Sequence, residues 1–230
     1  MDKIPFGVYD FFAYLSSGAI LLVTADYILS LGLLGQKDVG VTLGLVLIIF
    51  AYVSGQVVAH FASLVLERFV VGRILKRPTS VLLGEPARSR ILIWIFPGYY
   101  RALPAGTRDR ICQRARARGV GAQDESLFLH VYAVVTSGSE RTQGRLDEFR
   151  NQYGFARNVG FAFFLASIAV IVGHRLSYHP VRLRWAILAG LVSVTLFYRY
   201  LKFLRQYSYE LLLRYAELPL SGPKCTAEEG

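Results

Sequence analysis

The stretch that decides the fold is VGVTLGLVLIIFAYVSGQVVAHFASLVL, which runs from Val39 to Leu66 without a formal charge. About 20 mostly apolar residues are enough to cross the hydrocarbon core of a bilayer as a helix. A soluble protein with buried helices is the alternative, but a core helix has no need of so long an uncharged run. The stretch therefore predicts a transmembrane helix.

Three further apolar blocks extend this prediction to the whole chain, which is 53% hydrophobic. They lie near 9–34, 158–173 and 185–204. With the first stretch they predict an all-α integral membrane bundle, in which four transmembrane helices form two hairpins. The predicted parts are an N-terminal hairpin (1–75), a basic helical cytoplasmic region (76–157), a C-terminal hairpin (158–218) and a disordered tail (219–230).

The distribution of charge predicts the orientation. Between Gly72 and Arg157 there are 15 Lys or Arg and 7 Asp or Glu, within a net charge of +10 for the chain. Positively charged segments tend to remain on the cytoplasmic side. Arg175, Arg182 and Arg184 in the second short connection oppose the assignment but are outnumbered. We therefore expect a multi-pass protein of the cell inner membrane with both termini in the cytoplasm.

The basic region contains five arginines within one short predicted helix, 107–118. They are Arg108, Arg110, Arg114, Arg116 and Arg118. Such a cluster can attract anionic lipid headgroups or an acidic cytoplasmic protein, or it can simply control topology. Nucleic acid is not the expected partner, because no nucleic-acid-binding motif accompanies the charge.

A second feature of this region is the apolar run Ile91–Phe96, which is too short to span a bilayer. Arg88, Arg90 and Arg101 flank it, and Trp94, Tyr99 and Tyr100 are suited to the headgroup level. An in-plane segment at the membrane surface and an element of a small cytoplasmic core both remain open.

The polar residues of the second predicted helix form the main candidate site. Gln56, His60, Ser63 and Glu67 follow spacings of four, three and four, which place them in one stripe of an α-helix. Polar groups at membrane depth usually face protein or water. Three interpretations stay open: polar contacts that hold helices together, a water-filled ion or proton path, and a catalytic site.

The first predicted helix contains two aspartates, Asp10 and Asp26. Each is a possible partner for the polar stripe or a separate functional residue. Asp10 comes to a depth similar to that of His60 when both helices are measured at about 1.5 Å per residue. Asp26 lies nearer the outer end, either as a protonatable group or as a residue bound to nearby polar groups. The chain has no metal-ligand or nucleophile motif around these residues, so we expect no metal, no cofactor and, on balance, no enzyme.

Two short runs carry a resemblance to known proteins. They are Phe149-Arg150-Asn151-Gln152-Tyr153-Gly154-Phe155-Ala156-Arg157-Asn158 and the start Pro5-Phe6-x-x-Tyr9-Asp10-Phe11-Phe12-x-Tyr14. They resemble small uncharacterised bacterial inner-membrane proteins with two helices on each side of a cytoplasmic segment. Some proteins of that shape are membrane components of phage-defence systems, so the resemblance implies a role of that kind.

The function expected from these features is that of a non-enzymatic membrane protein that binds lipid or a partner through its basic region and acts on the membrane. Polar stripes and a small-residue face on the third helix, Ala162, Ala166, Ala169 and Gly173, predict a homo-oligomer. The alternative is an ion or proton pathway, or a small membrane enzyme, centred on His60.

Overall fold

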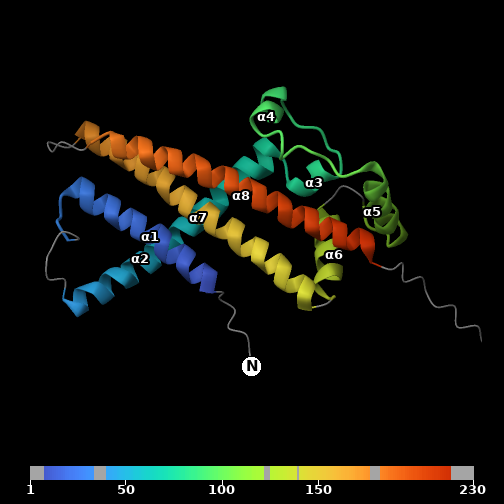
Figure 1. The fold of residues 1–230 in the computed structure, drawn as a ribbon, viewed down its shortest axis with the longest axis horizontal. Coiled ribbons are helices and arrows are strands. Elements are labelled where there is room, and N and C mark those ends of the chain that lie inside the picture. Colours follow the sequence, from blue (N-terminus) through green and yellow to red (C-terminus); the bar gives the residue numbers. More distant parts are fainter. Residues whose placement is uncertain (1–7, 34–39, 122–124, 139, 177–181, 219–230) are drawn as a thin grey trace, which may run out of the picture. The chain divides into compact units, whose positions relative to one another are not determined.

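The computed structural model describes residues 8–33, 40–121, 125–138, 140–176 and 182–218, and every regular element in these ranges is a helix (Figure 1). In chain order they are α1 (Val8–Leu29), α2 (Val41–Ala62), η1 (Ser63–Leu75), α3 (Pro78–Leu82), α4 (Arg90–Ile95), α5 (Ala105–Ala117), α6 (Glu125–Thr136), α7 (Glu140–Leu176) and α8 (Arg184–Glu217). The predicted all-α class is therefore confirmed. The predicted tail from 219 lies outside the described residues.

Four of these helical stretches are long and apolar enough to cross a membrane. They are Val8–Leu29, Val41–Leu82, Thr142–Leu176 and Arg184–Glu217. The four apolar blocks of the sequence thus each form a continuous helical stretch, as expected for a multi-pass membrane protein. The third block belongs to a longer helix, because α7 runs for 37 residues and includes a charged segment before the apolar block.

The second long stretch changes its helix type part of the way along. α2 passes directly into η1, a π-helix of 13 residues, in which hydrogen bonds reach one residue further than in an α-helix. The stretch turns at Lys76, whose φ of +69° lies in the left-handed region, and Pro78 then begins α3. The π-helical part was not predicted from the sequence.

The chain divides into two compact units, which are described separately. Unit 1 comprises residues 1–76 and 147–204, and unit 2 comprises residues 77–146 and 205–230. Each of the long helices α7 and α8 contributes one part to unit 1 and the other part to unit 2.

In unit 1, α1 and α2 approach so closely that their backbones touch. A Cβ atom on Gly18 would lie 1.7 Å from the carbonyl oxygen of Ala51, and one on Gly55 would lie 1.7 Å from that of Tyr14. Both distances are far below van der Waals contact, so only glycine fits at either position. Since later residues of α1 face earlier residues of α2, the two helices run in opposite directions.

The α7 and α8 segments of unit 1 are joined by serine hydroxyls. Ser193 Oγ donates to the carbonyl oxygen of Gly160 at 2.9 Å, and Ser167 Oγ donates to that of Ala186 at 2.8 Å. These bonds also connect later residues of one helix with earlier residues of the other. Hydroxyl-to-backbone bonds between helices are typical of membrane proteins, where helices pack closely through small residues.

The small-residue face of α7 is used within the chain itself. Ala162 and Phe161 form a buried cluster with Val58 and Ala62 of α2, and Ala166 is buried as well. Gly173 lies against Ile28 of α1. Because one copy of the chain already covers this face, it is no longer an argument for a homo-oligomer.

Unit 2 has an aliphatic and aromatic core. The side chains that are almost completely buried there are Val81, Leu82, Ile111, Ala115, Leu127, Val131, Leu211, Leu212 and Tyr215. They come from α3, α5, α6 and the last part of α8. In α6, Leu127, Val131 and Val135 follow helical spacing and are all buried.

Candidate functional site

The first half of the polar stripe faces away from the rest of unit 1. Gln56 and His60 are exposed on α2. The ring of His60 makes an edge-to-face contact with its neighbour Phe61, with 6.0 Å between the centroids. Asp10 is half-buried, and among the described residues it forms no ion pair with His60. The Asp10–His60 pairing considered from the sequence therefore remains without a contact that supports it.

The second half of the stripe belongs to a polar cluster. Ser63 Oγ donates to Glu67 Oε2 at 3.0 Å, and Arg157 Nη1 of α7 lies 2.5 Å from Glu67 Oε1. Arg157 also donates from Nε to Asn158 Oδ1 at 2.9 Å. The side chain of Arg157 is 16% exposed and that of Glu67 is 37% exposed. The carboxylate and the guanidinium therefore neutralise each other within the chain, and a charge in a membrane span needs such a partner.

The structure therefore divides the four residues of the stripe between two environments. The α-to-π change at Ser63 alters the rotation per residue, so a stripe drawn with α-helical spacing does not continue straight through it. Sequence reasoning missed Arg157 as the partner of Glu67. The available signal was that both charges lie at the predicted cytoplasmic ends of adjacent long helices.

Asp26 lies at the end of α1, where its Oδ1 accepts a hydrogen bond from the backbone N–H of Leu33 at 2.8 Å. Its own carbonyl oxygen accepts from Leu31 N at 3.2 Å. These contacts place the carboxylate at the turn that follows the helix. This position suits the structural interpretation, in which nearby polar groups satisfy the aspartate.

The five arginines of the 107–118 segment also divide into two groups. Arg114 Nη1 donates to the carbonyl oxygen of Tyr215 at 2.7 Å, and Arg108 lies against Gly84, which has a φ of +101°. Arg110, Arg116 and Arg118 are exposed. Two arginines thus help to hold unit 2 together, while three are available to bind an external anion.

The apolar run before α5 forms the short helix α4, which has no buried residue. Ile91, Ile93, Trp94 and Ile95 are all exposed, and the exposed fraction of Trp94 reaches 83%. Ser89 caps the helix by accepting a hydrogen bond from Ile91 N at 3.3 Å. Since α4 contributes nothing buried, the interpretation of this run as part of a cytoplasmic core is not supported.

The sequence predicted that Tyr99 would lie beside Trp94 and Tyr100 at the headgroup level. The side chain of Tyr99 is buried in unit 2, and burial raises the pKa of its hydroxyl far above the ordinary value of a tyrosine. A ring buried in this way is covered by protein and cannot itself contact lipid headgroups. Tyr100 is half-buried, and Trp94 is the most exposed of the three aromatic residues.

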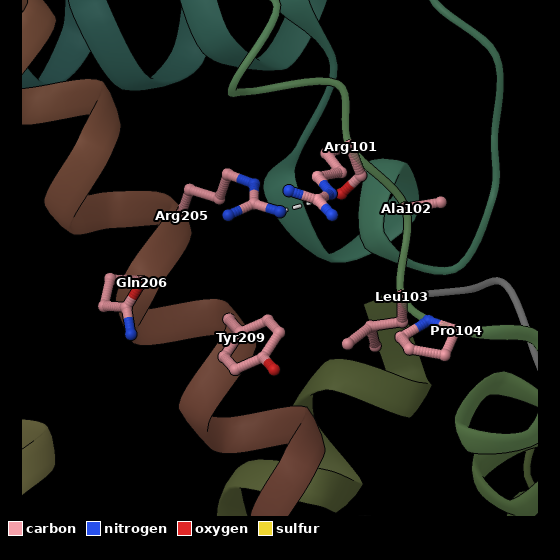
Figure 2. Close-up of a pocket in the computed structure, with 7 residues that line it drawn as sticks. All are labelled: Arg101, Ala102, Leu103, Pro104, Arg205, Gln206 and Tyr209. Carbon is pink, nitrogen blue, oxygen red and sulfur yellow. Dashed lines mark hydrogen bonds between the residues drawn. The ribbon is translucent and has the colours of Figure 1, made fainter.

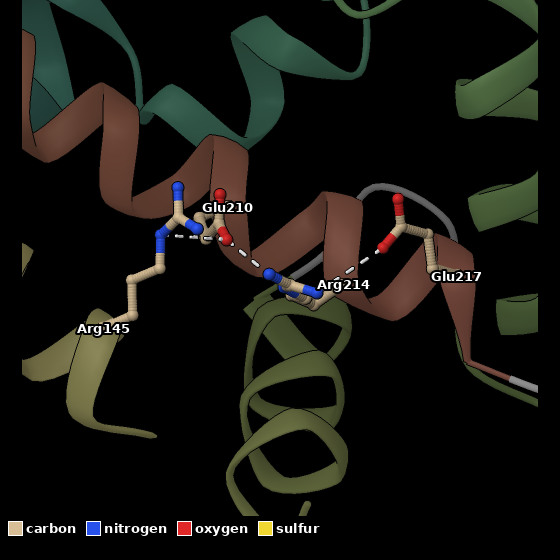
Figure 3. A network of polar contacts seen from close by, with 4 residues as sticks. All are labelled: Arg145, Glu210, Arg214 and Glu217. Atoms are coloured by element: carbon tan, nitrogen blue, oxygen red, sulfur yellow. Dashed lines mark hydrogen bonds and ion pairs between the residues drawn. The ribbon is translucent and has the colours of Figure 1, made fainter. Parts of the chain in front are cut away.

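Unit 2 also contains a neutralised acidic group on α8. Glu210 is buried, and its Oε1 lies 3.4 Å from Arg145 Nε and 3.2 Å from Arg214 Nε (Figure 3). Arg214 reaches Glu217 as well, with 3.8 Å between Nη1 and Oε2. This arrangement satisfies a buried carboxylate and is structural.

No group of three or more His, Cys, Asp or Glu side chains is placed to hold a metal ion within the described parts of the chain. The polar clusters found there are ion pairs and hydrogen bonds to the backbone, which can hold helices together. No protein-family model, curated protein or solved structure matches this chain.

Proposed function

We propose that this chain is a non-enzymatic, multi-pass protein of a cell inner membrane that binds anionic lipid of the same membrane through its basic cytoplasmic unit. In this proposal the four long apolar helices cross the bilayer as two hairpins. Unit 2 and both termini lie in the cytoplasm. The excess of Lys and Arg between Gly72 and Arg157 supports this orientation.

The observation that carries the proposal is the exposure of apolar side chains along α4, which has no fully buried residue. A helix that exposes three isoleucines and a tryptophan to water would be unfavourable, at about 25 cal/mol for each Å² of apolar surface left uncovered. The exposed side chains of Arg88, Arg90 and Arg101 flank it. An apolar patch with Trp and Arg neighbours is suited to the boundary between headgroups and acyl chains.

The exposed arginines at α5 supply the electrostatic part of the proposed binding. Arg110, Arg116 and Arg118 have no acidic partner among the described residues. Each cationic side chain near an anionic surface contributes roughly 1 kcal/mol. Lipid is favoured over an acidic protein because four spanning helices keep the chain at a bilayer.

The proposal also includes assembly of several copies, which act together on the membrane. Gln56 and His60 lie on the exposed face of α2, and polar groups in a span are favourable only beside protein or water. A second copy would provide such a neighbour. The resemblance of 149–158 and 5–14 to bacterial inner-membrane proteins adds phage defence as the proposed biological setting.

The alternative function, an ion or proton pathway or a small enzyme centred on His60, receives less support. Ser63 and Glu67 are occupied with each other and with Arg157, and the observed ring neighbour of His60 is Phe61. A pathway past Gln56 and His60 would have to form between copies of the chain.

The contact between α4 and the bilayer can be tested with tryptophan fluorescence, because the chain has only two tryptophans. Trp185→Phe leaves Trp94 as the single reporter. In nanodiscs made with lipids brominated on their acyl chains, we expect the emission of Trp94 to be quenched and shifted to the blue. Reconstitution without brominated lipid provides the reference intensity.

The matched control is Trp94→Phe, which leaves Trp185 at the start of the predicted fourth span. Its emission should be quenched whether or not α4 touches the membrane. If Trp185 is quenched while Trp94 keeps the emission of a water-exposed indole, α4 does not lie in the bilayer surface and the proposal loses its main support.

A further inference from the structure

Unit 2 contains a cavity that shares only Arg101 with the residues of the proposed function. Its volume is about 470 Å³, and it lies between α8 and the segment that leads into α5 (Figure 2). Its lining residues are Arg101, Ala102, Leu103, Pro104, Arg205, Gln206 and Tyr209. This volume falls within the range of small-molecule sites and exceeds what a bare inorganic anion would fill.

The two arginines of the cavity are held close to each other. Arg205 Nη2 donates to the backbone carbonyl oxygen of Arg101 at 2.8 Å, which fixes the guanidinium of Arg205 at the cavity wall. The side chains of Arg101 and Arg205 point toward one another in Figure 2. Arg205 Nε is buried and has no hydrogen-bond partner among the described residues.

Neither guanidinium has a carboxylate partner among the described residues. This distinguishes the cavity from the Glu210 cluster on the same helix, where Arg145 and Arg214 surround a buried acid. Two neighbouring positive charges repel each other, and an anion between them offsets this repulsion by attracting both. The arrangement is therefore favourable when an external anion occupies the cavity.

The chemistry of the lining indicates which kind of anion fits. Guanidinium groups bind phosphate oxygens through paired, charge-assisted hydrogen bonds. The amide of Gln206 and the hydroxyl of Tyr209 supply neutral hydrogen-bonding groups, and Leu103 and Pro104 supply an apolar wall. We propose that this cavity binds a phosphomonoester, whose phosphate lies between Arg101 and Arg205 and whose organic group fills the remaining space.

The phosphomonoester could be a lipid headgroup or a soluble metabolite, and the experiment separates these sources. The full chain is reconstituted in phosphatidylcholine nanodiscs and titrated with glycerol 3-phosphate, with glycerol as the control ligand. In a second arm the nanodiscs contain phosphatidic acid, with phosphatidylglycerol as a control for negative charge without a monoester. The thermal unfolding midpoint is measured in both arms, and calorimetry gives the affinity for the soluble ligand.

We expect a saturable rise of the midpoint in at least one arm, and the responding arm identifies the source. Arg101→Gln should weaken binding about tenfold or more through loss of a charge-assisted contact. It keeps the backbone carbonyl that holds Arg205, so the unit should still fold. Gln206→Leu is a second variant of the lining. Arg73→Gln is the matched control, because Arg73 is exposed on η1 and the change removes the same charge outside the cavity.

Absence of a shift with glycerol 3-phosphate and with phosphatidic acid would overturn the proposal. An equal response of Arg101→Gln and Arg73→Gln would also overturn it. So would a shift of the same size with phosphatidylglycerol, because binding would then reflect general surface charge. The cavity and the α4 surface are tested separately, so either proposal can fail without the other.

Discussion

The two units of the chain are held together in different ways. In unit 1, α1 and α2 touch through backbone atoms at Gly18 and Gly55, and serine hydroxyls bond α8 to α7. In unit 2, leucine, valine and tyrosine side chains from four helices fill a core. Lipid provides no hydrophobic force between helices, so close packing matters there, whereas burial of apolar side chains stabilises a unit in water. The contrast supports the proposal that unit 1 lies in the bilayer and unit 2 on the aqueous side.

The two units also differ in how their charged side chains are neutralised. The half-buried charges of unit 1 at Glu67 and Arg157 neutralise each other within the chain. Unit 2 leaves Arg110, Arg116 and Arg118 exposed at its surface. A charge inside a membrane is costly unless a group of the protein neutralises it. A charge in water is hydrated and remains free to bind an external anion.

The largest effect is expected from Gly55→Ala, which tests the packing of unit 1. The new methyl group would lie 1.7 Å from the carbonyl oxygen of Tyr14, so α1 and α2 would have to move apart. We expect a loss of about 1–3 kcal/mol or more of unfolding free energy. The measurement is the thermal unfolding of the purified protein in detergent.

Gly44→Ala is the matched control on the same helix, since nothing lies within 4 Å of a Cβ atom there. It should leave the stability unchanged or raise it by up to about 1 kcal/mol, because alanine is the better helix former. Equal effects of the two substitutions would mean that α1 and α2 do not approach through Gly55.

Glu67→Gln should have the next largest effect, because it leaves the guanidinium of Arg157 without its carboxylate. We expect a loss of about 1–3 kcal/mol, less than for a fully buried pair, because Glu67 is partly exposed. The double variant Glu67→Gln/Arg157→Gln should recover part of the loss, since it removes the unpaired charge. Thermal unfolding of the single and double variants measures this coupling.

Glu148→Gln is the control for the change of acid to amide, because Glu148 is exposed on α7. Its unfolding temperature should stay near that of the unchanged protein. Additive losses in the Glu67 and Arg157 variants would show that the two residues do not act as a pair.

The sequence predicts those features of unit 1 that depend on long apolar runs. The four helices that are long and apolar enough to span a membrane follow from the apolar blocks. α7 is continuous because no proline interrupts the chain between Glu140 and Leu176. The π-helix from Ser63 could not be predicted, because the spacing of apolar residues was interpreted with α-helical geometry. The pairing of Glu67 with Arg157 joins residues far apart in the chain, so it depends on the tertiary fold.

In unit 2 the sequence identified the basic and apolar segments but not the roles of their members. Five arginines of similar spacing gave no reason to separate Arg114, which binds a backbone carbonyl of α8, from the exposed Arg116. Similarly, Tyr99 and Trp94 were both suited to a membrane surface by residue type. Only the packing of unit 2 separates the buried ring of Tyr99 from the exposed ring of Trp94.

The smallest effect on stability is expected from Arg110→Gln/Arg116→Gln/Arg118→Gln, which should change lipid binding alone. In nanodiscs that contain anionic lipid, hydrogen exchange of α5 amides should be slower than in neutral nanodiscs at low salt. The triple variant should lose this difference, and high salt should reduce it in the unchanged protein through screening.

The matched control is Arg175→Gln/Arg182→Gln/Arg184→Gln, which removes the same charge from the predicted outer side of the membrane. It should keep the difference between anionic and neutral nanodiscs. If exchange of α5 is the same in both kinds of nanodisc at low salt, the exposed arginines do not contact lipid and only their effect on topology remains.

The assignment of unit 1 to the bilayer and unit 2 to the cytoplasm is tested most directly by reporter fusions. A reporter after Lys37 and another after His179 fall in the two short connections, which lie outside the described residues; both should give an external signal. A reporter at Gly121, between α5 and α6, should give a cytoplasmic signal. An external signal at Gly121 would contradict the orientation and, with it, the proposed contact of unit 2 with the cytoplasmic membrane surface.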